Sequence, residues 1–287
     1  SRRNQSAKLR LARGDRGGQT FTANIPDQCT DWLVENVWIA HTHAGFWLRG
    51  VSRGVVRGCR VYLTYADGIN LNRGSHNNVV EHNYVRGVGD DGLAILSQNY
   101  DNPTHAVTHA NTLRSNTVIA NWWGHNCDLA GGGGHVVEDN YLADNSRTGC
   151  FTINLTSAYP MFPLKDSIVR RNTIVRGGGS HSGQRRGAFW ILADGTPISG
   201  LTVRENEIRD SVFSAIHIRG GSPQEIVFEA NVVDGAGEAP VRIETEAKGS
   251  GSFVRNVFKK LPEGATAFSN RGGDDYAFTE RENRTEK

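Results

Sequence analysis

The sequence lacks three features that would each indicate a different class of protein: an excess of one charge, a long apolar run and dense cysteine. Its 32 Lys and Arg residues nearly balance 30 Asp and Glu residues, so the net charge of +2 gives no overall attraction to nucleic acid or an anionic membrane. No run of about 18 apolar residues is present, and we therefore expect no membrane-spanning segment. With 287 residues, the chain is long enough to bury a core.

The four cysteines, Cys29, Cys59, Cys127 and Cys150, match no zinc-binding spacing, so we expect no structural metal. Buried free thiols are the simplest interpretation, and a Cys127–Cys150 disulfide is the alternative in an oxidising compartment. The chain also lacks a charged start followed by an apolar stretch, so an exported protein would already have lost its signal peptide.

What the sequence does contain is glycine, with 34 residues spread along the chain, and a repeated pattern, apolar-x-x-Asn-x-apolar. Seven copies carry asparagine at the fourth position: Asn83, Asn116, Asn140, Asn172, Asn206, Asn231 and Asn256. Two earlier copies have Val37 and Cys59 in that position, which makes nine units. Most anchors lie 22 to 25 residues apart, and three steps are longer.

This period predicts a solenoid of strands. Leucine-rich repeats share it, but their framework is absent, and no unit has a helical apolar face. Each unit instead holds short apolar stretches broken by Gly, Asn and Asp, which is typical of strands joined by turns. We therefore expect an all-β parallel β-helix of about nine or more coils.

The repeated asparagines have a structural interpretation, because identical turn positions lie above each other in a solenoid and amides can bond along the stack while tolerating left-handed backbone angles. Insertions around 97–110, 154–166 and 177–188 are expected to form loops beside a cleft. The expected organisation is an N-terminal cap or first coil, the β-helix, and a C-terminal cap or tail without the repeat, at 1–30, 31–258 and 259–287.

Charge that a solenoid does not need occurs at Asp67 and Asp91, each eight residues after its anchor, with Asp90 adjacent. Equivalent positions on neighbouring coils lie about 5 Å apart, so these carboxylates should raise at least one pKa and titrate together. The alternative is that both Asp-Gly pairs merely form turns. A double aspartate alone is weak evidence, since Asp274-Asp275 follows two glycines in the tail.

Acids with separated pKa values suit glycoside hydrolysis. Asp67 and Asp91 would hold a water as general base, and Asp90 would be the general acid; the exchange of Asp90 and Asp91 remains open.

Three segments, Tyr65 to Leu71, Asn78 to Arg86 and Gly89 to Ser97, together with Asn-Trp-Trp-Gly at 121–124, resemble the core of glycoside hydrolase family 87, the α-1,3-glucanases and mycodextranases. The resemblance implies a right-handed β-helix that hydrolyses internal α-1,3-glucosidic bonds with inversion. It also implies a catalytic trio at Asp67, Asp90 and Asp91.

Other β-helix enzymes fit less well. The Gly-His-Gly and Arg-x-Lys elements of polygalacturonases are absent, and we find no acids grouped with a basic residue as in calcium-dependent lyases. A lyase and a non-catalytic glycan-binding or structural β-helix remain the alternatives.

Sugar subsites commonly present aromatic faces and polar groups. Trp122 and Trp123 follow the acids by one unit, and we expect one to face the cleft and the other the core. Further substrate-binding candidates are His43, Trp47, Tyr65, His125, Asn126 and Asp128. Trp38 and Trp190 are expected in the core. The histidine pairs at 41/43 and 105/109 have no carboxylate partner in register, so no metal or other cofactor is predicted.

The sequence thus predicts a secreted, monomeric, endo-acting glycoside hydrolase whose partner is a neutral α-glucan, with no nucleic acid or membrane partner.

Overall fold

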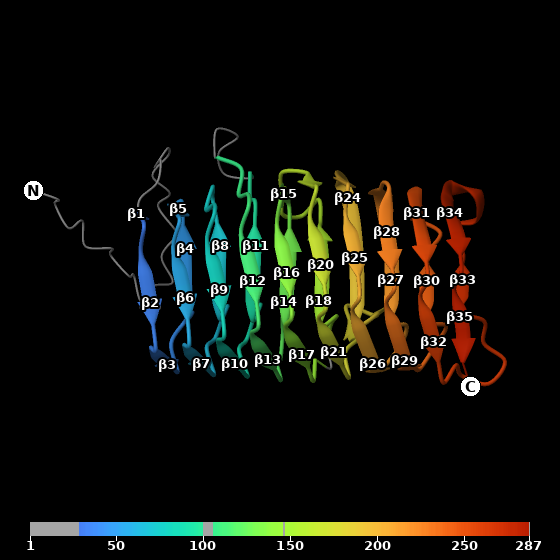
Figure 1. Cartoon of the computed structure of the whole chain (residues 1–287), viewed down its shortest axis with the longest axis horizontal. Coiled ribbons are helices and arrows are strands. Elements are labelled where there is room, and N and C mark those ends of the chain that lie inside the picture. Colours follow the sequence, from blue (N-terminus) through green and yellow to red (C-terminus); the bar gives the residue numbers. More distant parts are fainter. Residues whose placement is uncertain (1–28, 100–105, 146, 287) are drawn as a thin grey trace, which may run out of the picture.

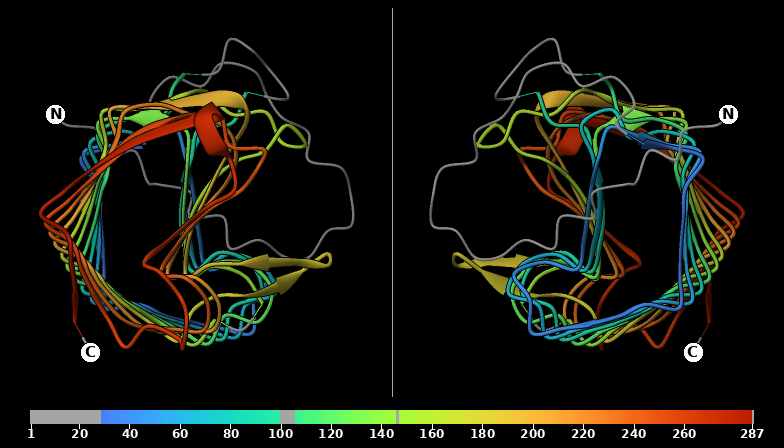
Figure 2. Two further views of the ribbon diagram at one scale, coloured as in Figure 1. Left: turned by 90° about the vertical axis from the view of Figure 1, so that its right-hand side faces the viewer. Right: turned by 90° about the vertical axis from the view of Figure 1, so that its left-hand side faces the viewer.

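The computed structural model describes residues 29–99, 106–145 and 147–286. Figure 1 shows short strands stacked side by side along one axis, and the end views in Figure 2 show successive coils superposed. In the described part of the chain the only helix is a 3-10 turn, η1 (Gly273–Asp275), and no helix is long and apolar enough to span a membrane. The all-β parallel β-helix is therefore confirmed.

Three long parallel sheets form the walls of the coils. Sheet 1 contains β2 (Leu33–Glu35), β6 (Val55–Arg57), β9 (Val79–Glu81), β12 (Thr112–Arg114), β16 (Val136–Glu138), β20 (Ile168–Arg170), β25 (Thr202–Arg204), β28 (Ile226–Glu229), β31 (Gly249–Val254) and β34 (Tyr276–Arg281). Sheet 2 contains β3 (Trp38–Ala40), β7 (Arg60–Tyr62), β10 (Tyr84–Arg86), β13 (Thr117–Ile119), β17 (Tyr141–Ala143), β21 (Thr173–Val175), β26 (Glu207–Ser211), β29 (Val232–Ala236), β32 (Val257–Lys259) and β35 (Arg284–Glu286).

Sheet 3 carries the polar side chains discussed below. Its main path contains β4 (Phe46–Arg49), β8 (Ile69–Asn72), β11 (Leu93–Leu96), β14 (Cys127–Ala130), β18 (Phe151–Leu155), β24 (Phe189–Ser199), β27 (Ile216–Pro223), β30 (Val241–Ile243) and β33 (Phe268–Asn270). Two short strands join it beside that path, β15 (Gly132–Gly133) and β19 (Leu164–Lys165). A separate parallel pair is β1 (Cys29–Thr30) with β5 (Val51–Ser52), and an antiparallel hairpin is β22 (Gly179–His181) with β23 (Gln184–Arg186).

The repeated asparagines form the predicted ladder. Each Nδ2 donates to the Oδ1 of the next asparagine at 2.9–3.0 Å, and each backbone N–H donates to the same oxygen at 2.9–3.0 Å. The ladder is buried over most of its length and runs through Asn83, Asn116, Asn140, Asn172, Asn206, Asn231, Asn256 and Asn283. The left-handed backbone angle, however, belongs to the residue before each asparagine, for example φ 57° at Asp139.

The last coil contradicts the prediction that residues 259–287 form a cap or tail without the repeat. Strands β33, β34 and β35 continue all three sheets, and Asn283 occupies an eighth ladder position. The pattern missed this coil because its two apolar positions are Glu280 and Thr285, which are exposed at the end of the solenoid. A side chain that is not covered by a further coil need not be apolar.

Trp38 is a second correction, since it is 66% exposed, whereas Trp190 is buried as predicted. The neighbouring Ile39 points into the core, so Trp38 points outward, where the Arg60 guanidinium lies 4.5 Å from its ring centre.

The four cysteines have free thiols, so the alternative disulfide is not formed. Cys127 and Cys150 are fully buried in the core, and burial raises the pKa of Cys150 to about 12.

The predicted insertions are partly ordered by strand pairing. The segment 177–188 forms the hairpin β22–β23, and Met161, in the segment 154–166, pairs with Gln98. Part of the insertion at 97–110, residues 100–105, lies outside the described residues.

Candidate active site

Asp67 and Asp91 occupy one position on neighbouring coils, as predicted. Ile69 of β8 pairs with Leu93 of β11, which places the two aspartates, each two residues earlier, next to each other. The backbone N–H of Asp91 donates to Oδ1 of Asp67 at 3.2 Å. On the next coil, His125 takes this position, because Leu93 pairs with Cys127.

The glycines after these aspartates are required by close packing rather than by a turn. A Cβ on Gly68 would lie 2.5 Å from the carbonyl oxygen of Gly92, and a Cβ on Gly92 would lie 2.7 Å from that of Asn126. Neither glycine has a positive φ. The alternative that both Asp-Gly pairs are turn formers therefore fails. Close packing against the next coil accounts for each glycine, and turn formation does not account for the aspartates.

The predicted trio is brought together. Asp67, Asp90 and Asp91 each offer an oxygen, and these three oxygens lie within 4.8 Å of one another. Asp67 and Asp91 are buried, while Asp90 as a whole residue is exposed, with its Oδ1 close to Gly124. The Asn70 side-chain amide donates to Oδ2 of Asp67. One carboxyl group thus faces solvent, and two are held in place behind it.

A second cluster shares Asp91 with the first. Nδ1 of His125 lies 2.8 Å from Oδ1 of Asp91, and the His125 backbone N–H donates to the same oxygen at 3.0 Å. Asp128, on β14, accepts a hydrogen bond from Oγ1 of Thr152 at 2.7 Å. Asp91, His125 and Asp128 have ligand atoms within 4.8 Å of one another.

Sequence reasoning proposed Asp128 and His125 only as sugar contacts. In the structure both are buried and extend the acidic cluster. Asp128 lies three residues beyond the column of Asp67, Asp91 and His125, since it pairs with Ala94 and Thr152. An alignment of the units on strand residues, rather than on the ladder alone, would have found it.

Burial and mutual repulsion raise the pKa values of several carboxyl groups in this cluster. Burial, followed by the charges of Asp91 and Asp90, raises the pKa of Asp67 well above its ordinary value. Burial, followed by the charge of Asp91, raises the pKa of Asp90 to about 6 and that of Asp128 to about 7. Burial lowers the pKa of His125, but contact with Asp91 outweighs it, so the net shift is upward. The cluster can therefore hold protons near neutral pH.

An aromatic strip lies beside Asp90 and consists of His43, Tyr65, Trp122 and Trp123. Successive ring centres are 5.6, 6.4 and 6.4 Å apart. Tyr65, Trp122 and Trp123 are 70%, 51% and 48% exposed. The strip approaches the acids at Gly89, where a Cβ would lie 2.7 Å from the Trp122 ring.

The prediction that one of the two tryptophans faces the core is wrong. Residues 122–124 form a bend rather than a strand, so the alternation of strand side chains does not apply to them.

Of the two remaining substrate-binding candidates, one lies next to the acids and the other has a structural role. Trp47, half-buried on β4, pairs with Asn70 beside the acids. Asn126 is fully buried, and its amide donates to the carbonyls of Val118 and Ala143 while its Oδ1 accepts from Asn145. Its side chain is therefore committed to the fold, which contradicts its predicted role in substrate binding.

The two acidic clusters are also the groups of described residues whose donors could hold a metal ion. Carboxylate oxygens and an imidazole are suitable ligands for several divalent cations. The prediction of no metal is not tested by this geometry.

Comparison with known proteins adds family information to this geometry. The model of the family "alpha-1,3-glucanase catalytic domain D2" matches residues 12–237, well over half of the chain. The chain belongs to this family. The resemblance to glycoside hydrolase family 87 is thereby confirmed. A search of curated protein sequences found no match to this α-1,3-glucanase family member.

Solved structures show the same fold. The catalytic domain of a family 87 α-1,3-glucanase in complex with nigerose has a TM-score of 0.77 and 21% identity, over 89% of this chain and 49% of that one. The catalytic unit of the thermostable α-1,3-glucanase from Streptomyces thermodiastaticus strain HF3-3 has a TM-score of 0.76 and 23% identity, over 89% and 49%.

A more distant match is the A-module of the mannuronan C-5 epimerase AlgE6 from Azotobacter vinelandii, with a TM-score of 0.63 and 13% identity, over 90% and 65%. Our chain spans about half the length of the α-1,3-glucanase structures that it matches. Three family 87 structures carry alanine in place of a different single aspartate, in complexes with nigerose or tetrasaccharides.

Proposed function

We propose that this chain is the catalytic part of a glycoside hydrolase that cleaves internal α-1,3-glucosidic bonds in a neutral α-glucan. The observation that carries the proposal is the convergence of Asp67, Asp90 and Asp91, with oxygens within 4.8 Å and raised pKa values at Asp67 and Asp90. A β-helix needs no such group of acids, whereas glycoside hydrolysis requires one protonated and one ionised carboxyl group.

The contacts of the three acids support different roles. Asp90 is the exposed member and has a pKa of about 6, so it can carry a proton to the leaving glycosidic oxygen. Asp91 accepts a hydrogen bond from the His125 backbone N–H, and the same oxygen lies 2.8 Å from Nδ1 of His125, so this carboxyl group is held in a fixed position behind Asp90. Asp91 together with Asp67 therefore acts as the base that orients and deprotonates the attacking water.

The intervals along the chain provide independent support for this trio. The three aspartates that alanine replaces in the family 87 structures stand at the same mutual intervals as Asp67, Asp90 and Asp91. Their replacement in complexes with bound oligosaccharide fits a role in the reaction rather than in the fold.

The surroundings of the acids support a neutral substrate. The exposed rings of Tyr65, Trp122 and Trp123 offer faces on which pyranose rings can stack, beside the exposed acid Asp90. The relatives' complexes with nigerose and tetrasaccharides support an α-1,3-linked glucan. A polymeric substrate too large to enter a cell supports secretion, and we propose that the enzyme acts outside the cell as a monomer.

Inversion at the anomeric carbon is part of the proposal and has a direct test. In inverting enzymes the carboxyl groups are commonly about 6.5–9.5 Å apart, and in retaining enzymes about 5–5.5 Å. The nearest oxygens of this trio are closer than the inverting range. Inversion here requires the water to sit against the Asp67 and Asp91 pair, on the side of the sugar opposite Asp90.

Proton NMR during the hydrolysis of an α-1,3-glucan oligosaccharide should show the β-anomer as the first product. An α-anomer formed first would show that one aspartate is a nucleophile. Release of reducing ends from α-1,3-glucan, without an unsaturated product that absorbs ultraviolet light, would separate the hydrolase from a lyase. Binding without any release of reducing ends would favour a non-catalytic glycan-binding protein.

A further inference from the structure

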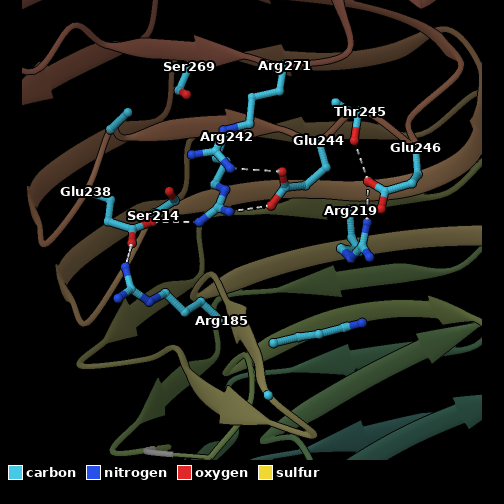
Figure 3. A pocket seen from close by; sticks show the side chains of 13 residues that line it. Arg185, Ser214, Arg219, Glu238, Arg242, Glu244, Thr245, Glu246, Ser269 and Arg271 are labelled. Atoms are coloured by element: carbon cyan, nitrogen blue, oxygen red, sulfur yellow. Dashed lines mark hydrogen bonds and ion pairs between the residues drawn. The ribbon is translucent and has the colours of Figure 1, made fainter.

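A hollow lies on sheet 3, nearer the C-terminal end of the solenoid than the aspartate cluster. It has a volume of about 650 Å³ and is lined by side chains from β27, β30, β33 and the hairpin β22–β23 (Figure 3). We call it the arginine–glutamate pocket, after the lining residues Arg185, Arg219, Glu238, Arg242, Glu244 and Glu246. Among its described lining residues, the largest apolar side chain is Ala239. Any molecule bound in this pocket would therefore make mainly polar contacts.

The charges in the pocket are already paired with each other. Glu238 contacts Arg185 at 2.6 Å and Arg242 at 2.9 Å, and Arg242 contacts Glu244 at 2.6 Å. Arg219 and Glu246 form a separate pair at 2.6 Å. An anionic ligand would have to compete with these carboxylates, whereas a neutral ligand rich in hydroxyl groups can donate to the carboxylates and accept from the guanidinium groups.

The pocket continues the column that contains the acids. From Asp91 the strand register passes through His125, Gly149 and Gly187 to Ser214, which lines the pocket. Four strand spacings separate Asp91 from Ser214, or about 19 Å. The two glycines between His125 and Ser214 place no side chain in this column.

The hairpin β22–β23 connects the two regions on one side. The His181 ring lies 5.9 Å from the Trp123 ring at the end of the aromatic strip, and Arg185 reaches Glu238 in the pocket. Figure 2 shows this hairpin, in yellow, projecting from the stack of coils. The aromatic strip, the hairpin and the pocket therefore follow one another along the solenoid axis.

We propose that the arginine–glutamate pocket is a second carbohydrate-binding site, which holds a neutral stretch of the polysaccharide about 19 Å from the acids. This inference rests on the proposed function for the identity of the sugar. A chain long enough to reach both sites gains affinity because binding at the second site becomes intramolecular. The pocket thus favours long substrates over short ones.

The test uses the double variant Arg219→Ala/Glu246→Ala, which removes one lining pair without changing net charge. The matched control is Arg57→Ala/Glu35→Ala, an exposed pair on sheet 1 with a contact of 2.7 Å. In the Asp90→Asn background, calorimetry with an α-1,3-linked tetrasaccharide should detect two sites per chain. The pocket variant should retain one site, and the control variant should retain two.

With Asp90 intact, the pocket variant should lower the ratio of polymer to tetrasaccharide turnover by roughly tenfold or more, and the control should leave the ratio unchanged. One binding site in the parent, or two in the pocket variant, would overturn the proposal. Preferential binding of an oligogalacturonate in the pocket would also overturn it. If no hydrolysis is found, the proposed function is wrong. The number of binding sites measured by calorimetry still tests the second site in that case.

Discussion

The asparagine ladder and the aspartate column are both sets of residues in register on successive coils, yet they behave in opposite ways. The ladder repeats one neutral side chain through eight positions, and each amide satisfies the next. The aspartate column stops after Asp67 and Asp91 and gives way to His125. Amides can stack without limit because each is both donor and acceptor, whereas stacked carboxylates repel. In a solenoid, a short column of like charges therefore indicates a candidate catalytic site, and a long column of neutral side chains indicates a structural role.

The largest expected effect is the loss of turnover in Asp90→Asn. Removal of the proposed general acid should lower kcat by about 10²–10⁴-fold on α-1,3-glucan, because the amide cannot donate a proton to the leaving oxygen. The exposed position of Asp90 means that Tm should stay within a few degrees of the parent value, as measured by calorimetry. Near-normal turnover in the variant would remove Asp90 from the mechanism.

The pH dependence sharpens the assignment of the acid. Since Asp90 must be protonated and its pKa is about 6, kcat/KM should be high below pH 6 and fall about tenfold per pH unit well above it. A pH series of initial rates measures this limb. A rate that instead rises through pH 7 would show that Asp90 works in its ionised form and that its role is exchanged with that of Asp91.

In the ladder, Asn140→Ala should damage the fold and not the chemistry. The change leaves the amide groups of Asn116 and Asn172 and the carbonyl of Leu113 without this partner, at a cost of about 2–4 kcal/mol in the free energy of unfolding. Denaturant unfolding measures the loss, and kcat at low temperature should remain close to the parent value. A kcat loss comparable to that of Asp90→Asn would erase the contrast between the two columns.

Asp128→Asn should stabilise the protein at high pH only. The pKa of Asp128 is raised from 3.8 to about 7, so the folded state holds a proton that the unfolded state releases between these values. Stability is therefore lost as pH rises from about 4 to about 7, and the full cost is present above pH 7. The amide keeps the oxygen that accepts from Thr152 and avoids this cost. Thermal unfolding should give a higher Tm than the parent at pH 8 and a similar Tm at pH 4. An equal shift at both pH values would contradict a charge effect.

The smallest expected effect is on sugar binding. Trp122→Ala should raise KM roughly three- to tenfold through the loss of about 1 kcal/mol of ring stacking, with kcat changed less. Trp38→Ala is the matched control, because Trp38 is also an exposed tryptophan but lies on sheet 2. Equal KM changes in the two variants would show that the aromatic strip does not contact the substrate.

The sequence was sufficient to predict the coils and the close approach of Asp67, Asp90 and Asp91, because both depend on the ladder spacing. It was insufficient wherever the tertiary environment decides. The last coil was missed because Glu280 and Thr285 replace apolar residues at an uncovered end, and Trp38 was misplaced because its neighbour Ile39 takes the core position. The arginine–glutamate pocket was missed because its ion pairs join residues that are far apart in sequence, such as Arg185 and Glu238.

The ladder also has a consequence for how such a protein can change. Its bond lengths stay at 2.9–3.0 Å whether the intervening coil is short or carries an insertion. The segments beside the acids can therefore be exchanged, lengthened or shortened between two asparagines without shifting the frame that aligns the carboxyl groups. Selectivity for new glycans can then be engineered by swapping the inter-asparagine segments that carry none of the three aspartates, such as those between Asn140 and Asn206.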